Sequence, residues 1–182
     1  MAYVRRILTD PDPLLRKVAK KVTGLELKLP LTQQLIDDML ETMHAAPGIG
    51  LAAPQVGASK RIIVVHVGDN DGPFVVINPV LTDFEGEVVG AEGCLSIPGK
   101  VGDVKRAERC TISGSDRKGK AFRLRAEGML ARCFQHEVDH LDGVLIYDKA
   151  TDWRDAVPLE AADAVPLEAG GKEEAVVHIA EI

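Results

Sequence analysis

The stretch EGMLARCFQHEVDHL, residues 127–141, decides how the chain is expected to fold. Its apolar residues lie around more than one face of a helix, and Gly143 follows at the position where glycine commonly ends a helix. A helix that is apolar on several faces packs inside a domain. Because the same stretch contains the only dense cluster of histidines in the sequence, we expect the functional site to be built on this helix.

Strand-like segments surround this helix, and no helical segment separates them from one another. RIIVVHV (61–67) and FVVINP (74–79) are β-branched runs joined by GDNDG, which predicts a hairpin. Residues 104–113 and 120–126 flank DRKG and predict a second antiparallel pair. VLIYD (144–148) predicts a last strand.

Two helices are expected before these strands. Asp12 followed by Pro13 resembles an N-cap with proline in the first turn, which predicts a short helix. From Leu31 to Met43, apolar residues recur at the three-and-four spacing of one helical face, and Pro47–Gly48 ends that pattern. The sequence therefore predicts antiparallel β-sheet, together with helices of which the one at 127–141 packs inside the domain.

Length and charge divide the chain into two parts. The 182 residues, 46% of them hydrophobic and 27% charged, are typical of one globular domain. Residues 1–149 contain 20 basic and 20 acidic side chains, whereas residues 150–182 contain two basic and eight acidic ones. The tail also repeats an octapeptide, at 155–162 and 163–170. We expect a folded domain over 1–149 and an acidic, flexible C-terminal tail over 150–182.

The same composition sets the expected surroundings. The sequence contains no apolar run near the ~20 residues that a transmembrane helix needs, and the start of the chain lacks the pattern of a signal peptide. Three cysteines at irregular spacing are typical of a reducing compartment. The neutral body does not suggest a broad basic surface. We therefore expect a cytoplasmic protein without membrane association or direct nucleic-acid binding.

The sharpest chemical signal is the HEVDH sequence that begins at His136. His136 and His140 are four residues apart and share one helical face, so both imidazoles can bind one metal ion, and Glu137 can reach a water held by that ion. The alternative is a pair of partly buried histidines that hydrogen bonds satisfy. The spacing favours the metal-binding interpretation.

A catalytic ion needs a third protein ligand from another segment. Cys133 is on the same helix but about 10.5 Å from His140 along the axis, which is too far for ligands that must converge on one ion. Cys94, Cys110 or an acidic residue elsewhere remain as candidates. We favour Cys94 because Gly90 and Gly93 allow a tight turn there, and assign Cys110 and Cys133 to packing.

A third segment, GIGLAAPQ (48–55), contains small residues against which a substrate chain could lie. Gln55 at its end provides an amide that can donate a hydrogen bond to a developing oxyanion. A glycine pair of this kind is by itself usually just a turn.

Together, GIGLAAPQ (48–55), EGCLS (92–96) and QHEVDHLDG (135–143) resemble, in this order and spacing, the three signature motifs of peptide deformylases. The overall layout of the sequence agrees with that of the family from about residue 3 to residue 148. The resemblance implies an α+β fold, with antiparallel β-sheets packed around a central helix that carries the HExxH motif. It implies removal of the formyl group from the formyl-methionine of newly made polypeptides. It also implies a ferrous ion bound by Cys94, His136 and His140, for which zinc or nickel can substitute.

The resemblance also implies roles for individual residues. Glu137 corresponds to the general base, while Gln55 and the backbone N–H of Leu95 correspond to groups that stabilise the oxyanion. The positions that border the substrate correspond to Gly48, Ile49, Gly50 and Cys133. Contact with the ribosome is a further expectation, although this acidic, proline-interrupted tail differs from the basic terminal helix with which some bacterial deformylases dock there.

Two other functions use the same residues. A zinc endopeptidase would use the HExxH chemistry on internal peptide bonds. A structural metal module would close the site with four protein ligands, with Cys110 as the fourth.

The uncoordinated ring N–H groups of the histidines should find acceptors, for which Glu92 and Asp139 are both candidates.

Overall fold

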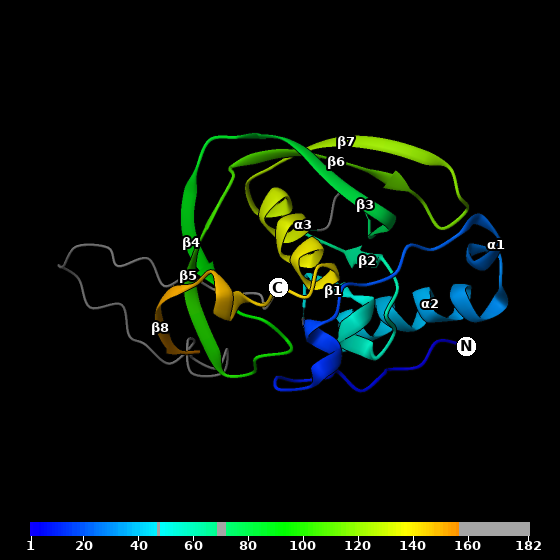
Figure 1. Cartoon of the computed structure of the whole chain (residues 1–182), viewed down its shortest axis with the longest axis horizontal. Coiled ribbons are helices and arrows are strands. Elements are labelled where there is room, and N and C mark those ends of the chain that lie inside the picture. Colours follow the sequence, from blue (N-terminus) through cyan, green and yellow to red (C-terminus); the bar gives the residue numbers. More distant parts are fainter. Residues whose placement is uncertain (47, 69–71, 157–182) are drawn as a thin grey trace.

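The computed structural model describes residues 1–46, 48–68 and 72–156. Its elements follow the predicted α+β pattern, because the chain forms both antiparallel strands and helices (Figure 1). The helices of the described residues are α1 (Gly24–Leu27), α2 (Pro30–Ala45) and α3 (Gly128–Leu141), with 3₁₀ turns η1 (Pro13–Arg16), η2 (Ala53–Val56) and η3 (Ile146–Asp148).

The strands form two antiparallel sheets. The five-stranded sheet has the order β1 (Gly50–Ala52), β2 (Ile62–Val65), β3 (Phe74–Glu85), β6 (Arg109–Ser115) and β7 (Ala121–Glu127). The three-stranded sheet has the order β4 (Val88–Glu92), β5 (Lys100–Arg106) and β8 (Thr151–Asp155). The predicted hairpin is confirmed, because β2 pairs with β3 from Ile62↔Ile77 to Val65↔Phe74. The pair β6 and β7 is confirmed as well.

Strand β2 is buried on both faces, which explains its unbroken β-branched sequence. Ile63 and Val65 belong to the apolar cluster that contains Phe134 of α3. Ile62 and Val64, which alternate with them, belong to the cluster that contains Met39 of α2. Successive side chains of a strand point to opposite faces, so α2 and α3 cover opposite faces of the sheet near β2.

Helix α2 confirms the predicted helix at 31–43 and extends it by one residue at the start and two at the end. The expected apolar stripe is buried, at Leu35, Ile36, Met39 and Met43. The predicted short helix after Asp12 is the single 3₁₀ turn η1, whose first turn the Asp12 side chain caps by accepting a hydrogen bond from Leu14 N–H at 2.9 Å.

Helix α3 confirms the predicted third helix and packs on the five-stranded sheet through β1, β2, β3, β6 and β7. In Figure 1 it runs below β6 and β7, with β4 and β5 to its left. Gly143 follows its end with a φ of 74°, and a Cβ atom there would lie 2.6 Å from the carbonyl oxygen of Arg16. Glycine is therefore required where the chain leaves the helix against η1.

The predicted strand at 104–113 is wrong in its continuity. Residues up to Arg106 belong to β5 in one sheet, and Arg109 begins β6 in the other. At the crossing, Ala107 bonds with the side-chain amide of Gln135: its N–H donates to Oε1 at 3.0 Å, and its carbonyl accepts from Nε2 at 2.9 Å. A side chain of α3 thus takes the hydrogen bonds that a neighbouring strand would supply.

The predicted strand at 144–148 is also wrong, because this segment forms the 3₁₀ turn η3. The Asp148 carboxylate accepts a hydrogen bond from the Leu145 N–H at 2.9 Å and closes the turn locally. Leu145 and Ile146 are buried in a cluster with Leu15 and Cys94. Burial of two successive residues from a turn produces the same apolar pattern as a buried strand.

The C-terminal tail expected from residue 150 begins with β8, which pairs with β5 from Lys100↔Asp155 to Asp103↔Thr151. The duplicated octapeptide from 157 onward and the segment 176–180 lie outside the described residues. The boundary at 149/150 therefore stays a prediction.

The extended N-terminal segment connects two of the sequence motifs. Leu8 N–H donates to the carbonyl of Gln55 at 2.7 Å, and Asp10 N–H donates to the carbonyl of Ser96 at 2.9 Å. Earlier in the segment, Tyr3 N–H donates to the Asp38 carboxylate of α2 at 2.9 Å. The first ten residues thus hold the loops after β1 and β4 beside each other.

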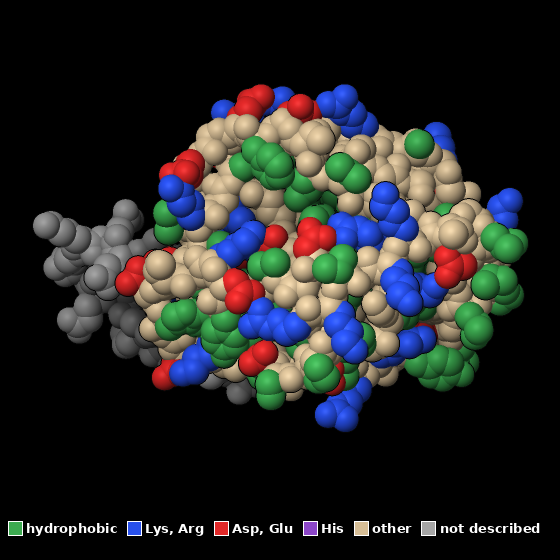
Figure 2. Space-filling model, in the orientation of Figure 1, with side chains coloured by type: hydrophobic (Ala, Val, Ile, Leu, Met, Phe, Trp, Pro, Cys, Tyr) green, Lys and Arg blue, Asp and Glu red, His purple; other side chains and the backbone are tan. Residues whose placement is uncertain are grey.

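Figure 2 shows the face of the molecule that is turned to the viewer in Figure 1. On this face, Lys and Arg side chains are interspersed with acidic and hydrophobic ones. Among the described residues, no helix has both the length and the apolar character needed to cross a membrane.

Candidate metal centre

Helix α3 places His136 and His140 one turn apart on one face, as their spacing predicts. Both imidazoles are buried, with ring centroids 5.0 Å apart. Burial, and secondly the neighbouring His136, hold the pKa of His140 well below its usual value. A neutral imidazole is the form that binds metal ions.

Cys94 meets these histidines from the loop after β4. Its Sγ atom lies 3.3 Å from Nε2 of His140, and the three residues offer ligand atoms that all lie within 4.8 Å of one another. All three side chains are buried. The structure therefore brings together Cys94, His136 and His140, which the sequence analysis selected as the metal ligands.

Cys110 and Cys133 do not join this group. The Cys110 thiol approaches the Ala131 carbonyl at 3.9 Å, and the Cys133 thiol approaches the Ile49 carbonyl at 3.5 Å. Burial raises the pKa of Cys110 to about 11, which favours a protonated thiol over a metal-binding thiolate. These contacts give no support to a fourth ligand from Cys110.

The donor set fits a divalent transition-metal ion. Within the described part of the chain, Nε2 of His136 is buried and has no hydrogen-bond partner, although a buried polar atom normally has one. One thiolate and two imidazoles are ligands that suit zinc, iron and nickel. A metal ion would supply the partner that the His136 nitrogen lacks.

Glu92 fixes the orientation of His136. Its Oε2 lies 3.0 Å from His136 Nδ1, and the carboxylate also accepts hydrogen bonds from Arg106 at 2.9 Å on each oxygen and from Arg132 at 2.7 Å. Burial alone would raise the pKa of Glu92, but the hydrogen bonds from Arg106 and His136 outweigh it and hold that pKa well below its ordinary value. Of the two candidate acceptors, Glu92 is the one that binds His136.

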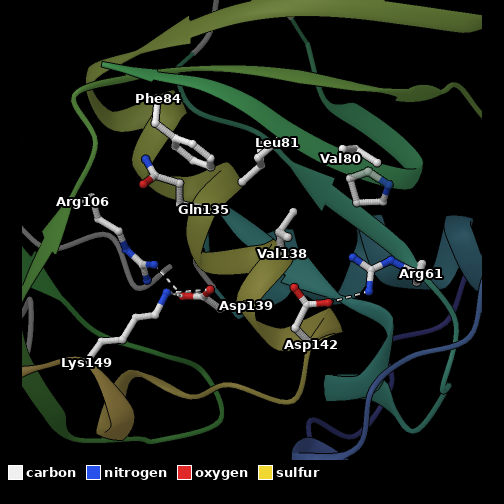
Figure 3. Close-up of a pocket in the computed structure, with 11 residues that line it drawn as sticks. Arg61, Val80, Leu81, Phe84, Arg106, Gln135, Val138, Asp139, Asp142 and Lys149 are labelled. Carbon is white, nitrogen blue, oxygen red and sulfur yellow. Dashed lines mark hydrogen bonds and ion pairs between the residues drawn. The ribbon is translucent and has the colours of Figure 1, made fainter. Parts of the chain in front are cut away.

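Asp139, the other candidate, does not bind His136 but shares Arg106 with Glu92. Its carboxylate pairs with Arg106 and with Lys149. Figure 3 shows these pairs beside a pocket of about 350 Å³ that also contains the ion pair between Arg61 and Asp142. This pocket lies against β3 and is separate from the three metal-ligand candidates, none of which lines it.

Glu137 is buried beside the ligands, and among the described residues neither carboxyl oxygen has a hydrogen-bond partner. Burial raises its pKa well above the usual value, and the negative charge of Glu92 raises it further. Space for this carboxyl comes from Gly50 in β1, where a Cβ atom would lie 2.3 Å from Oε1 of Glu137 and 2.7 Å from Sγ of Cys133.

Gln55, in η2, directs its amide group toward Cys94. Its Oε1 accepts a hydrogen bond from Ala52 N–H at 2.8 Å, which orients the side chain. Its Nε2 donates to Oγ of Ser96 at 3.2 Å and approaches Sγ of Cys94 at 3.9 Å. The amide hydrogens therefore lie at the edge of the metal-ligand cluster.

The other predicted site residues lie in the same region. Leu95, which is buried, directly follows Cys94. Ile49 accepts a hydrogen bond from His66 N–H at 2.8 Å, and Gly50 pairs with Val65 as the first residue of β1. Gly48 directly precedes Ile49.

The sequence did not predict the burial of two arginines, Arg106 and Arg132. Arg106 ends β5 and Arg132 lies on α3, and both bind Glu92. Arg132 is four residues before His136, so the sequence could have predicted that both side chains lie on the same face of α3. Nothing in the sequence around Arg106 indicated that its side chain is buried, because its position depends on how the two sheets pack against α3.

A buried glutamate that has no hydrogen-bond partner among the described residues, placed beside one thiol and two imidazoles, is the arrangement of a metal-dependent hydrolase. The family model for polypeptide deformylase matches residues 4–156. The chain belongs to the polypeptide deformylase family.

Individual relatives agree with this assignment. The chain is 48% identical over 180 residues to a peptide deformylase of Symbiobacterium thermophilum, covering 98% of this chain and 76% of the relative. It is similar to the crystal structure of a peptide deformylase from Legionella pneumophila, with a TM-score of 0.77, 45% identity, and coverage of 81% and 86% of the two chains. A Met-Ala-Ser-bound class I type b peptide deformylase from Acinetobacter baumannii has a TM-score of 0.78 at 35% identity, with 82% and 99% covered.

The activity is accordingly the metal-dependent hydrolytic removal of the formyl group from N-terminal formyl-methionine, which releases formate.

Proposed function

We propose that Cys94, His136 and His140 hold one Fe²⁺ ion, which Zn²⁺ or Ni²⁺ can replace. The single observation that supports this most strongly is the convergence of the three ligand atoms within 4.8 Å, beside a Glu137 carboxyl that has no hydrogen-bond partner in the described part of the chain. Glu92 supports the same assignment, because a carboxylate on the far nitrogen of a ligating histidine fixes its tautomer. A bound divalent ion lowers the pKa of its water toward neutrality and polarises a carbonyl oxygen.

Glu137 is proposed as the general base and then the general acid. One of its carboxylate oxygens takes a proton from the attacking water while the water oxygen bonds to the formyl carbon. The same carboxyl then gives the proton to the peptide nitrogen as the C–N bond breaks, which leaves formate and a free amino terminus. The raised pKa of Glu137 supports this role, because the carboxyl must hold the proton between the two transfers.

Gln55 and the backbone N–H of Leu95 are proposed to stabilise the negative charge on the formyl oxygen. The hydrogen bond from Ala52 N–H supports the role of Gln55, because it directs the amide hydrogens away from the backbone and toward Cys94. A donor that is oriented before the reaction costs no reorganisation in the transition state.

The peptide is proposed to lie along Gly48, Ile49 and Gly50, with Cys133 bordering the site beneath them. Strand β1 is at the edge of the five-stranded sheet, so its outer side can pair with an extended peptide. The relative from Acinetobacter baumannii is described with Met-Ala-Ser bound, a tripeptide that has the form of a deformylated product.

Further expectations are proposals of the same kind. We take α3 as the central helix that carries the HExxH motif and residues 1–149 as the catalytic domain. Newly made chains in the cytoplasm are the proposed substrates, with contact at the ribosome as a proposed partner interaction. The acidic tail from residue 150 is the proposed appendage.

The deciding experiment is Glu137→Gln, assayed for formate release from formyl-Met-Ala-Ser with anaerobically prepared protein of measured metal content. We expect one ion per chain and almost no formate. Undiminished turnover would contradict the role of Glu137. Cleavage of internal bonds in an unblocked peptide would instead support an endopeptidase.

A further inference from the structure

A pair of histidines lies outside the catalytic site. His44 is in the last turn of α2, and His66 follows the end of β2. Nε2 of His44 lies 3.0 Å from Nδ1 of His66, and the ring centroids are 5.3 Å apart. His44 is exposed and His66 half-buried, so solvent reaches the pair.

The distance between these nitrogens suits two ligands of one ion. Two imidazole nitrogens that each lie about 2.0–2.1 Å from a metal are separated by about 2.9 Å at a bond angle of 90° and about 3.4 Å at a tetrahedral angle. The observed 3.0 Å falls between these values. Without an ion, one ring donates a hydrogen bond to the other across this distance. When an ion binds, that ring carries its proton on the nitrogen that faces away, so both facing lone pairs can bind the ion.

The position of His44 adds a second favourable factor. The carbonyl groups at the C-terminus of a helix carry a partial negative charge, which stabilises a cation placed there. Helix α2 is 16 residues long, and His44 is its penultimate residue. A cation between the two rings would therefore lie close to the negative end of the helix dipole.

We propose that His44 and His66 form a second metal site, which binds a divalent transition-metal ion such as Zn²⁺. The two imidazoles supply two ligands and water completes the coordination, because within the described part of the chain the only cluster of three or more metal-ligand residues is the catalytic one. The site differs from the catalytic one in its exposure and in its lack of a thiolate. It therefore binds its ion more weakly and exchanges it faster.

The test uses the zinc-loaded holoenzyme, so that the catalytic site is already filled. Equilibrium dialysis against increasing free Zn²⁺ measures how many further ions bind to the wild type, His44→Gln and His66→Gln. We expect one further ion in the wild type, and an affinity about 100-fold weaker in either variant, because a single imidazole loses the effective concentration of the second. An unchanged affinity in either variant would overturn the proposal.

His178→Gln provides the control, since His178 is the one histidine of the sequence that neither proposal uses. His178→Gln is expected to bind the second ion as the wild type does, and loss of binding there would overturn the proposal. Retention of the untagged protein on an immobilised Ni²⁺ resin gives an independent readout. It should fall in His44→Gln and His66→Gln and persist in His178→Gln, and retention that persists in the first two would contradict the site.

Discussion

Gly50 and Glu137 are in such close contact that a single methyl group between them is excluded. A Cβ atom at residue 50 would lie 2.3 Å from Oε1 of Glu137. The small residue that places β1 next to α3 thus also makes room for the carboxyl that we propose as general base.

Gly50→Ala is therefore expected to displace Glu137 and Cys133, and to destabilise the protein by about 1–3 kcal/mol because a packed interior does not absorb an added methyl group. Turnover should fall far more than the metal content. Steady-state kinetics, metal analysis and thermal unfolding together measure this. Gly24→Ala is the control, because a Cβ atom at Gly24 meets nothing within 4 Å. Equal behaviour of the two variants would contradict the interpretation.

Glu92→Gln removes the negative charge that faces Arg106 and Arg132 in the interior. Breaking a buried ion pair from one side costs about 3–5 kcal/mol. We also expect metal affinity to fall about 10–100-fold, since His136 loses its carboxylate partner. Denaturant unfolding and competition with a chelator measure the two effects.

The control for Glu92 is Glu87→Gln, whose ion pair with Lys105 is exposed, with 62% and 61% of the two side chains accessible. Its loss should cost at most about 1 kcal/mol. A Glu92→Gln protein that matched this control in stability and metal affinity would rule out the proposed role of Glu92.

Gln55→Glu keeps an oxygen that can accept from Ala52 N–H but replaces the amide donor near Cys94. Loss of one preorganised oxyanion donor typically lowers kcat by about 10²–10³-fold. We expect this decrease in kcat with little change in KM. A variant with wild-type kcat would show that the Gln55 amide does not stabilise the transition state.

Asp38 provides a test of pH dependence that is remote from the metal site. Burial raises its pKa, but hydrogen bonds from Gln34, Tyr3 N–H and Arg5 together lower it below the ordinary value. The unfolded chain then binds protons more readily than the folded one. The stabilisation is complete above the unfolded pKa of about 3.9 and is lost as the pH falls through the lower folded value.

Asp38→Asn should consequently lower the free energy of unfolding at neutral pH, by about 1–3 kcal/mol for hydrogen bonds to a charged group, and the difference from wild type should shrink in acid. Denaturant titrations across the acidic range measure this. Asp37→Asn is the control, since Asp37 pairs with Arg117 at the surface with 42% of its side chain exposed. A constant difference at all pH values would contradict the assignment.

Local spacing was enough to predict which side chains the structure brings together at the candidate metal centre. The separation of His136 and His140 fixes their shared face, and the glycines around Cys94 indicated the turn that brings its thiol to them. The residues that border the substrate came from the family resemblance, because small residues near Gly48 have no chemistry of their own.

What the sequence could not provide depends on distant packing. Glu92 and Asp139 were equal candidates, because the sequence does not show that β4 packs beside α3 and brings Glu92 to His136, while Asp139 pairs with Arg106 and Lys149. Arg106 looked like an ordinary strand residue, yet it is buried because Glu92 neutralises it. The sequence predicted a strand at 144–148 because its apolar residues are buried. Buried apolar residues occur in strands and in turns alike, and the sequence does not show whether a neighbouring strand is present to pair with the segment.

The backbone bonds of Leu8 and Asp10 also bear on the order in which the protein is assembled during its own synthesis. Leu8 and Asp10 find their partners only after Gln55 and Ser96 have been translated, and the last of the three proposed metal ligands, His140, comes 44 residues after Ser96. Contacts of such long sequence separation form slowly. Almost the whole described part of the chain must therefore be translated before the three proposed metal ligands can come together.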